Sequence, residues 1–147
     1  MTVEQLRIKI EELEALLNSG KDFDEVEKKA RELLLDDTLA NESDLHCRTL
    51  LALSQSLSQR GLAKDALPYA ELALTITEQI ESKELQAKAL GYIGTVHSDL
   101  SDYALALEYL GKALSLNEEL GNKAGMATCL SNIGIVHLEH SDYALAL

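Results

Sequence analysis

Hydrophobic and small residues recur along the chain at the spacing of one face of an α-helix. In the segment 124–139 they recur at helical spacing, at Ala127, Leu130, Ile133, Gly134 and His137. A second stripe of this kind runs through the segment 103–119, at Ala106, Leu110, Ala113 and Leu114. Because a helix turns once in 3.6 residues, each stripe marks the buried face of an amphipathic helix.

Short polar breaks separate these helical patterns. Ser101-Asp102 and Ser141-Asp142 are suited to start a helix, and Gly121-Asn122 combines a helix-ending residue with a helix-starting one. The pattern predicts no strands, seven complete helices in antiparallel pairs and the start of an eighth. The seven helices are expected near residues 4–18, 23–36, 44–60, 63–80, 83–100, 103–120 and 123–140.

The same pattern returns every 40 residues. Residues 91–107 and 131–147 are identical at 11 of 17 aligned positions. The offset continues towards the N-terminus, where Leu13 aligns with Leu53, Ile93 and Ile133. Self-similarity at a fixed period predicts a repeat architecture. We expect one solenoid over 1–147, with repeats at about 3–42, 43–82, 83–122 and an incomplete 123–147.

The repeated residues resemble the signature of the tetratricopeptide repeat family. They are Asn132-Ile133-Gly134, His137, Asp142-Tyr143 and Ala146, with Tyr109, Ala113 and Leu114 from the preceding repeat. The longer, 40-residue period is similar to repeats of bacterial signalling proteins and of cell-polarity and receptor-clustering scaffolds. The resemblance implies an all-α, right-handed superhelical solenoid of paired helices, A and B, whose A helices line a concave wall.

Small residues have a defined role in such repeats, because they let helix A approach helix B closely. The resemblance assigns this role to Gly94 and Gly134 in the A helices and predicts that both are buried. The first repeat departs from the pattern, since Glu14 stands where Gly is expected. That repeat is therefore either a cap or more loosely packed on the next one. His97 and His137 occupy a packing position of the family and are expected to pack rather than to bind metal.

Composition and charge narrow the function. A formal net charge of −12 disfavours nucleic acid and anionic membrane surfaces as partners, since both attract basic proteins. No segment has the apolar length of a signal peptide or a transmembrane helix. The two cysteines, Cys47 and Cys129, lie far apart in the chain, which favours the reducing cytoplasm.

The chain carries no motif of an enzyme or of a cofactor site. Metal-ligand spacings, phosphate-binding loops and nucleophile elbows are all absent from the sequence. Adjacent acidic residues such as Glu118 and Glu119 point in different directions on a helix, so they do not form acid–base pairs. The sequence therefore predicts no catalytic residues, no metal and no cofactor.

The resemblance places a protein-binding surface on the A helices. The residues that it assigns to the concave wall are Arg48, Leu51, Gln55, Ser58, Lys88, Gly91, Thr95, Ser98, Thr128, Ser131, Ile135 and Leu138. Chaperone-binding members of the family hold a peptide's terminal carboxylate in a clamp of Lys, Asn and Arg. Here only Arg48 and Lys88 are basic, so the clamp is not expected. A mixed small and apolar wall suits an extended segment or an amphipathic helix of a partner protein.

We therefore expect a protein-interaction scaffold, the regulatory part of a larger cytoplasmic signalling protein. The alternative is a structural element whose copies stack end to end. Because the fourth repeat is incomplete, the flank around Leu130, Ile133 and His137 is expected to be uncovered, and self-association through this end is expected with it.

Overall fold

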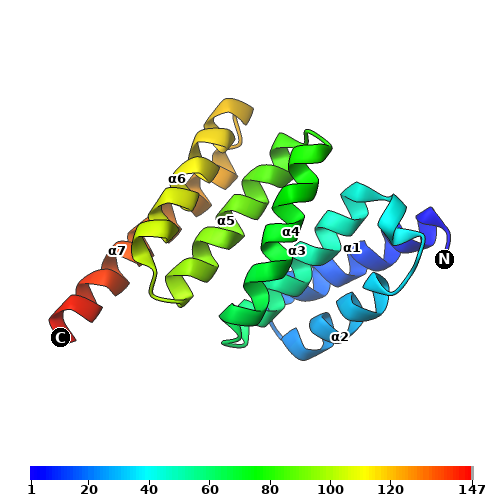
Figure 1. Cartoon of the computed structure of the whole chain (residues 1–147), viewed down its shortest axis with the longest axis horizontal. Helices are drawn as coiled ribbons and strands as arrows, with labels where there is room; N and C mark the ends of the chain where they lie inside the picture. Colours follow the sequence, from blue (N-terminus) through cyan, green and yellow to red (C-terminus); the bar gives the residue numbers. More distant parts are fainter. Residues whose placement is uncertain (147) are drawn as a thin grey trace.

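The computed structural model describes residues 1–146, and the side chains of residues 1–141. Over this range the chain forms seven α-helices and no strand, as the sequence predicted, and one short 3₁₀ helix. The α-helices are α1 (Val3–Ser19), α2 (Phe23–Leu34), α3 (Ser43–Gln59), α4 (Ala63–Gln79), α5 (Lys83–Asp99), α6 (Tyr103–Leu120) and α7 (Lys123–Ala146). They follow one another as a row of helices from the N-terminus to the C-terminus (Figure 1).

The helices begin and end where local chemistry satisfies their free backbone groups. Thr2 and Gln5 form a reciprocal capping box at the start of α1, with nitrogen-to-oxygen distances of 2.9 and 3.1 Å. Asp102 caps α6 by accepting from the Leu105 amide. Gly121 ends α6 in the left-handed conformation, with φ 66°, which glycine adopts without steric cost. Two of the breaks expected from the sequence, at Ser101-Asp102 and at Gly121-Asn122, are thus present.

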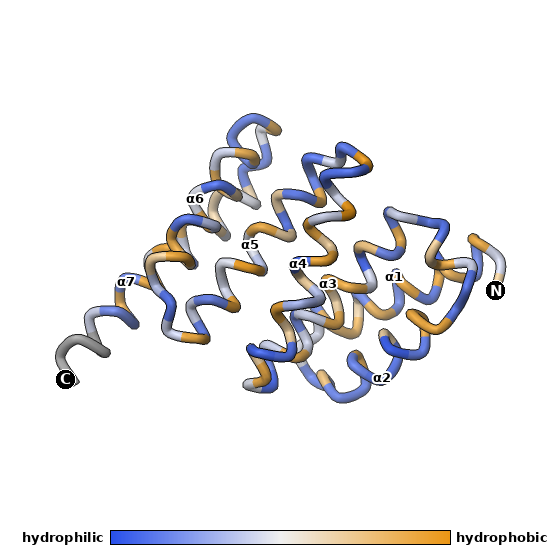
Figure 2. Tube along the Cα trace, viewed as in Figure 1, coloured by the Kyte–Doolittle hydropathy of each residue, from blue (hydrophilic) through white to orange (hydrophobic). Residues whose placement is uncertain are grey.

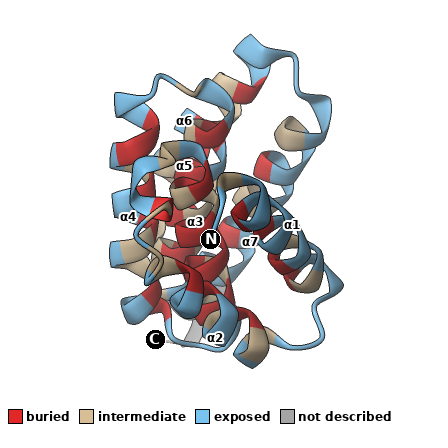
Figure 3. Ribbon diagram, turned by 90° about the vertical axis from the view of Figure 1, so that its right-hand side faces the viewer, coloured by how far each residue is buried: buried red, intermediate tan, exposed pale blue. Residues whose placement is uncertain are grey.

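The core lies between the helices. Hydrophobic and hydrophilic residues alternate along each helix trace (Figure 2), and the buried residues gather where helices face one another (Figure 3). Helix α3 contacts α1, α2, α4 and α5, and ten of its residues are buried. The largest cluster of buried side chains joins α1, α2 and α3 and extends to Ala63 and Ala66 of α4 and Val96 of α5. Each pair buries too little alone, and contact with its neighbours completes the core.

The first pair differs from the others. Helix α2 ends at Leu34, two residues before the predicted end, and a 3₁₀ helix (η1, Leu39–Asn41) follows that the sequence did not predict. The Asp36 carboxylate accepts from the Thr38 amide at 2.9 Å and from the N-terminal amine at 3.1 Å, which fixes a turn in place of further helix. Leu39, only 1% exposed, then fills the core from η1.

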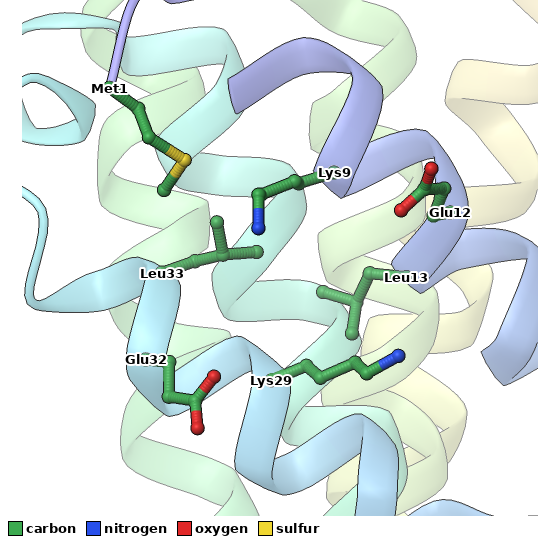
Figure 4. Close-up of a pocket in the computed structure, with 7 residues that line it drawn as sticks. All are labelled: Met1, Lys9, Glu12, Leu13, Lys29, Glu32 and Leu33. Atoms are coloured by element: carbon green, nitrogen blue, oxygen red, sulfur yellow. The ribbon is translucent and has the colours of Figure 1, made fainter. Parts of the chain in front are cut away.

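Helices α1 and α2 also touch each other less than the later pairs do. A pocket of about 170 Å³ lies between them, with Leu13 and Leu33 at its base. Charged side chains from both helices face one another across it: Lys9 and Glu12 from α1, Lys29 and Glu32 from α2 (Figure 4). The looser packing thus lies within the first pair, whereas α1 and α2 both contact α3 of the next repeat.

The prediction of a break at Ser141-Asp142 is wrong, because α7 runs unbroken from Lys123 to Ala146. In the preceding repeat, Ser101 takes a positive φ of 62° and Asp102 caps a helix whose Ala106, Leu110 and Ala113 are fully buried. Only five residues follow Asp142 in this chain. Starting a separate helix of that length requires an unfavourable nucleation step, whereas extending α7 adds one backbone hydrogen bond per residue.

Candidate functional site

The A helices α1, α3, α5 and α7 contact one another in sequence order and present a common face, which we call the A-helix wall. Side chains link neighbouring A helices across this wall. The Arg48 guanidinium binds the Glu14 carboxylate through two nitrogens, with the Nε to Oε2 distance at 3.1 Å. Arg48 also lies 3.7 Å from the Asp44 carboxylate. The hydrogen bond that Arg48 donates to Glu14 raises the pKa of Arg48, so the guanidinium stays protonated and its positive charge is paired with the carboxylate of Glu14.

Two serine–carboxylate hydrogen bonds repeat this linkage at the other end of the wall. The Ser58 hydroxyl donates to Asp99 at 2.6 Å, and the Ser98 hydroxyl donates to Glu139 at 2.9 Å. Each bond joins one A helix to the next. Although Asp99 is exposed as a residue, desolvation of its carboxylate raises its pKa, the bond from Ser58 lowers it, and the charge of Glu139 raises it further.

A first pocket on the wall has a volume of about 230 Å³ and is built by three consecutive A helices. Helix α1 contributes Glu14 and Leu17, α3 contributes Arg48 and Leu51, and α5 contributes Lys88 and Tyr92. Burial, and then the charge of Glu14, raise the pKa of the Tyr92 hydroxyl. At neutral pH this hydroxyl is therefore a neutral hydrogen-bonding group beside an apolar floor.

A second pocket, of about 300 Å³, lies on the other side of Lys88 and Tyr92. Gly91 of α5 and Thr128, Cys129 and Asn132 of α7 line it. At its edge the Asn117 side chain, 6% exposed, donates from Nδ2 to the Cys129 sulfur at 3.5 Å. The two pockets thus share Lys88 and Tyr92 and are lined by residues of α1, α3, α5 and α7; we call the two pockets together the groove.

The residues predicted for the wall divide into three groups. Arg48, Leu51, Lys88, Gly91 and Thr128 line the two groove pockets, and Ser58 and Ser98 line a third hollow of about 560 Å³. Gln55 and Thr95 are half-buried, and the Thr95 hydroxyl donates to the Gly91 carbonyl at 3.0 Å. Ser131, Ile135 and Leu138 are exposed on α7.

The sequence analysis missed four residues that shape the wall: Glu14, Tyr92, Asn132 and Asn117. Tyr92 lies four positions after Lys88, and Asn132 four after Thr128, so helical spacing from the predicted positions could have identified both. Glu14 was noted only as a misfit at a glycine position. Its role as the partner of Arg48 depends on how α1 lies against α3, which no local pattern encodes.

The predictions for the small residues and histidines hold in α5 and fail in α7. Gly94 is buried, and the His97 ring stacks on Tyr109 with centroids 5.5 Å apart. Gly134 and His137, expected to be buried and packed, are exposed, because among the described residues no helix covers their side of α7. The exposed flank expected around Leu130 is present, with Leu130 itself 55% exposed.

The part of the chain that the structure describes holds no group of three His, Cys, Asp or Glu placed to bind a metal ion. Among the same residues, no helix has the length and apolar character needed to cross a membrane. Both thiols are free and buried, and burial raises the pKa of Cys47 to about 12 and that of Cys129 above its usual range. Both are therefore protonated thiols at neutral pH, and the thiol is the unreactive form.

Comparison with known proteins agrees with this architecture. Residues 85–147 match the family model described as tetratricopeptide repeat, a match that spans α5, α6 and α7. No curated protein matches the chain. The paired helices, their repeat and this match lead to one assignment: residues 85–147 belong to the tetratricopeptide repeat family.

Proposed function

We propose that the A-helix wall binds a segment of a partner protein, and that the chain serves as an interaction scaffold without catalytic activity of its own. The observation that carries the proposal is the groove of two pockets on either side of Lys88 and Tyr92. Tetratricopeptide repeats in general mediate protein–protein interaction. Pockets of about 230 and 300 Å³ each accommodate one or two side chains of a bound segment.

The chemistry of the groove defines the segment. Glu14 neutralises Arg48, so the exposed Lys88 is the cation that remains available in the groove. Apolar or small residues form the floor, and the amides of Asn122 and Asn132 lie at the edge of the second pocket. We infer an extended segment or amphipathic helix that places one apolar side chain in each pocket and an acidic or carbonyl group at Lys88.

We further propose a cytoplasmic, signalling role, with repeats at 3–42, 43–82, 83–122 and from 123 onward. The free thiols of Cys47 and Cys129 suit a reducing compartment. The 40-residue period supports the repeat boundaries.

A peptide library displayed on phage tests the groove. Peptides are selected on the intact chain, and their affinities are then measured for Gly91→Leu, in which a large side chain fills the groove at a residue with no atom within 4 Å of an added Cβ. Gly111→Leu is the matched control, since Gly111 is also helical and equally open but lies outside both groove pockets. Peptides that bind both variants as tightly as the unmodified chain would refute the proposal.

Self-association is a second candidate, and the exposed side of α7 favours it. Leu130, Ile135 and Leu138 are 55, 47 and 64% exposed, and Ile8 of α1, at the other end of the row, is 47% exposed. Copies stacked end to end would cover both surfaces through a heterologous contact. Sedimentation velocity over a range of concentrations decides this, and a strictly monomeric chain would remove the candidate.

A further inference from the structure

A second binding surface lies between two B helices, in the middle of the row. Helices α4 and α6 both pack on α5, which lies between them in the row (Figure 1), and a hollow of about 800 Å³ is lined by all three. Leu74 and Glu78 of α4, Leu90 of α5, and Gly111 and Lys112 of α6 line this hollow, which we call the B-helix cleft. None of these residues lines either pocket of the groove on the A-helix wall.

In the preceding repeat, an arginine connects the two neighbouring B helices. Arg31 of α2 donates from Nη1 to the Tyr69 hydroxyl of α4 at 3.0 Å. Its guanidinium also lies over the Tyr69 ring, 5.6 Å from the ring centroid. The Nε of Arg31 donates to the Glu27 carboxylate of its own helix at 2.9 Å. Arg31 thus lies between a carboxylate of one B helix and a tyrosine of the next.

This connection is missing between α4 and α6. Tyr109 of α6 stands 40 residues after Tyr69, and Glu71 of α4 stands 40 residues after Arg31. A carboxylate therefore occupies the position from which the guanidinium reaches the tyrosine in the preceding repeat. Among the described residues, neither the Glu71 side chain nor the Tyr109 hydroxyl takes part in a hydrogen bond or an ion pair. The cation that contacts Tyr69 thus has no counterpart from α4 at Tyr109.

The α4 side of the B-helix cleft carries unpaired negative charge. Glu71 and Glu78 lie two helical turns apart on one face of α4, and both are exposed. Neither forms an ion pair with another described residue. On the α6 side, Lys112 lies 3.5 Å from the Glu108 carboxylate, so its charge is already paired within its own helix. The cleft therefore attracts a positively charged group to its α4 side.

Gly111 leaves space for an apolar side chain in the same cleft. It lies in the interior of α6, where glycine is less favourable than alanine. An added Cβ at Gly111 would meet nothing within 4 Å, so no contact within the described chain requires a glycine there. Leu74 and Leu116, both half-buried, line the cleft with it. A side chain from outside can therefore approach the α6 backbone and pack on these leucines.

We propose that the B-helix cleft binds an arginine-bearing amphipathic segment of a partner protein. The arginine lies between Glu71 and the Tyr109 hydroxyl, as Arg31 lies between its own carboxylate and Tyr69. An apolar side chain of the same segment packs over Gly111. Charge complementarity along α4 and the arginine contact seen one repeat earlier carry the inference.

A second copy of the chain is a poor source of this segment. Each of its arginines already forms an ion pair: Arg7, Arg31, Arg48 and Arg60. Two copies, each with a formal net charge of −12, also repel one another. The same charge attracts a basic segment, so the occupant comes from a different protein.

Peptide selection on a chain whose wall is filled tests the proposal. Random peptides displayed on phage are selected on the Gly91→Leu variant, so that peptides of the A-helix wall are not enriched. Peptides that also bind Gly111→Leu, in which a large side chain fills the B-helix cleft, are discarded. The remaining peptides are expected to share an arginine with an apolar residue three or four positions away. They should bind the unmodified chain saturably in fluorescence anisotropy.

Glu71→Arg is the variant that tests the arginine contact itself, because it gives α4 the residue that α2 carries. The new arginine reaches the Tyr109 hydroxyl from within the chain and repels the arginine of the peptide, so the affinity should fall about tenfold or more. Glu12→Arg is the matched control, since it makes the same change of charge at an exposed residue of α1. This control should bind the peptides like the unmodified chain.

Three outcomes would overturn the proposal, once circular dichroism has shown that each variant is folded. The first is that no peptide remains after the Gly111→Leu step. The second is equal affinity of the peptides for Glu71→Arg and for the unmodified chain. The third is an equal loss of affinity in Glu71→Arg and Glu12→Arg, which would mean that overall charge and not the cleft attracts the peptides. The proposed binding at the A-helix wall is independent of these outcomes, since the wall is filled during the selection.

Discussion

Gly94 and Gly134 form a matched pair that isolates the energy of one close helix contact. Both are helical, both follow an isoleucine, and they occupy the same position of consecutive repeats. A Cβ at Gly94 would lie 2.8 Å from the Leu110 Cγ and 3.2 Å from the Ala106 carbonyl oxygen. A Cβ at Gly134 would meet nothing within 4 Å. Replacing each by Ala adds the same atom to the same backbone in two different environments.

The two variants are expected to change stability in opposite directions. In a helix interior, Gly→Ala stabilises by about 0.5–1 kcal/mol, and this is the whole expected effect at Gly134. At Gly94 the same gain is offset by overpacking, which costs about 1–3 kcal/mol when neighbours must shift. Leu110 is fully buried and the Ala106 carbonyl belongs to the helix backbone, so neither moves without disturbing α6. Since helix propensity cancels between the variants, the difference between their free energies of unfolding, about 1–3 kcal/mol, measures the close contact at Gly94.

Urea denaturation followed by circular dichroism gives both free energies of unfolding. Thermal unfolding is an independent check, since for a chain of this size about 1 kcal/mol corresponds to roughly 2–4 °C. The two sites lie in different repeats, so a change in the denaturant dependence would reveal loss of cooperativity in one of them. Equal stabilisation by both substitutions would mean that α6 can yield at Gly94, and the reasoning from the close contact would be refuted.

The carboxylates and thiols near the A-helix wall are expected to affect stability and reactivity in three measurable ways. The folded state raises the pKa of Asp99, so the stability linked to this carboxyl is fully present below its ordinary pKa and is lost as the pH rises through the raised pKa. Asp99→Asn should therefore raise the free energy of unfolding at pH 7 and not at pH 3. A gain in stability that does not depend on pH would contradict this. Cys47 is fully buried and its pKa is raised to about 12, whereas Cys129 lines the groove. In native protein at pH 8, Cys47 should therefore react with a maleimide far more slowly than Cys129. Mass spectrometry of the first labelled peptide checks the order of reaction. Glu14→Gln should cost about 1 kcal/mol by removing the charge that faces Arg48, and the cost should shrink at high salt; a loss that salt does not change would argue against the ion pair.

Most of the fold could be predicted from the sequence because local signals and the repeat agree. Helical spacing, caps such as Asp102 and the end residue Gly121 all indicate the same boundaries, and five of the seven helices end within one residue of the prediction. The exceptions are α2 and α7. At α2 an aspartate, Asp36, accepts from the N-terminal amine and from a nearby amide, a combination of distant and local contacts that helical periodicity does not contain.

The candidate site could be predicted only in outline. The wall positions taken from the repeat include five residues that line the groove, but the pattern could not show which of them are available to a partner. Arg48 and Lys88 are equivalent in the repeat, yet Arg48 is neutralised by Glu14 and Lys88 is exposed. The difference arises from a residue on another helix, 34 positions away in the chain. Whether a basic side chain is free to bind a partner thus depends on the neighbouring helix, which the sequence of its own helix does not describe.

Gly134 and His137 show the same limit more sharply. Ile93, Gly94, Val96 and His97 of α5 recur in α7 at the same positions of the repeat, so this face carries the same residue types in both helices. Gly134 and His137 are exposed whereas Gly94 and His97 are not, because burial depends on the helix that lies alongside. In a solenoid each contact is formed by two neighbouring helices, and each helix supplies one of the two surfaces. The sequence of one helix therefore specifies its own surface, but not whether a neighbouring helix covers it.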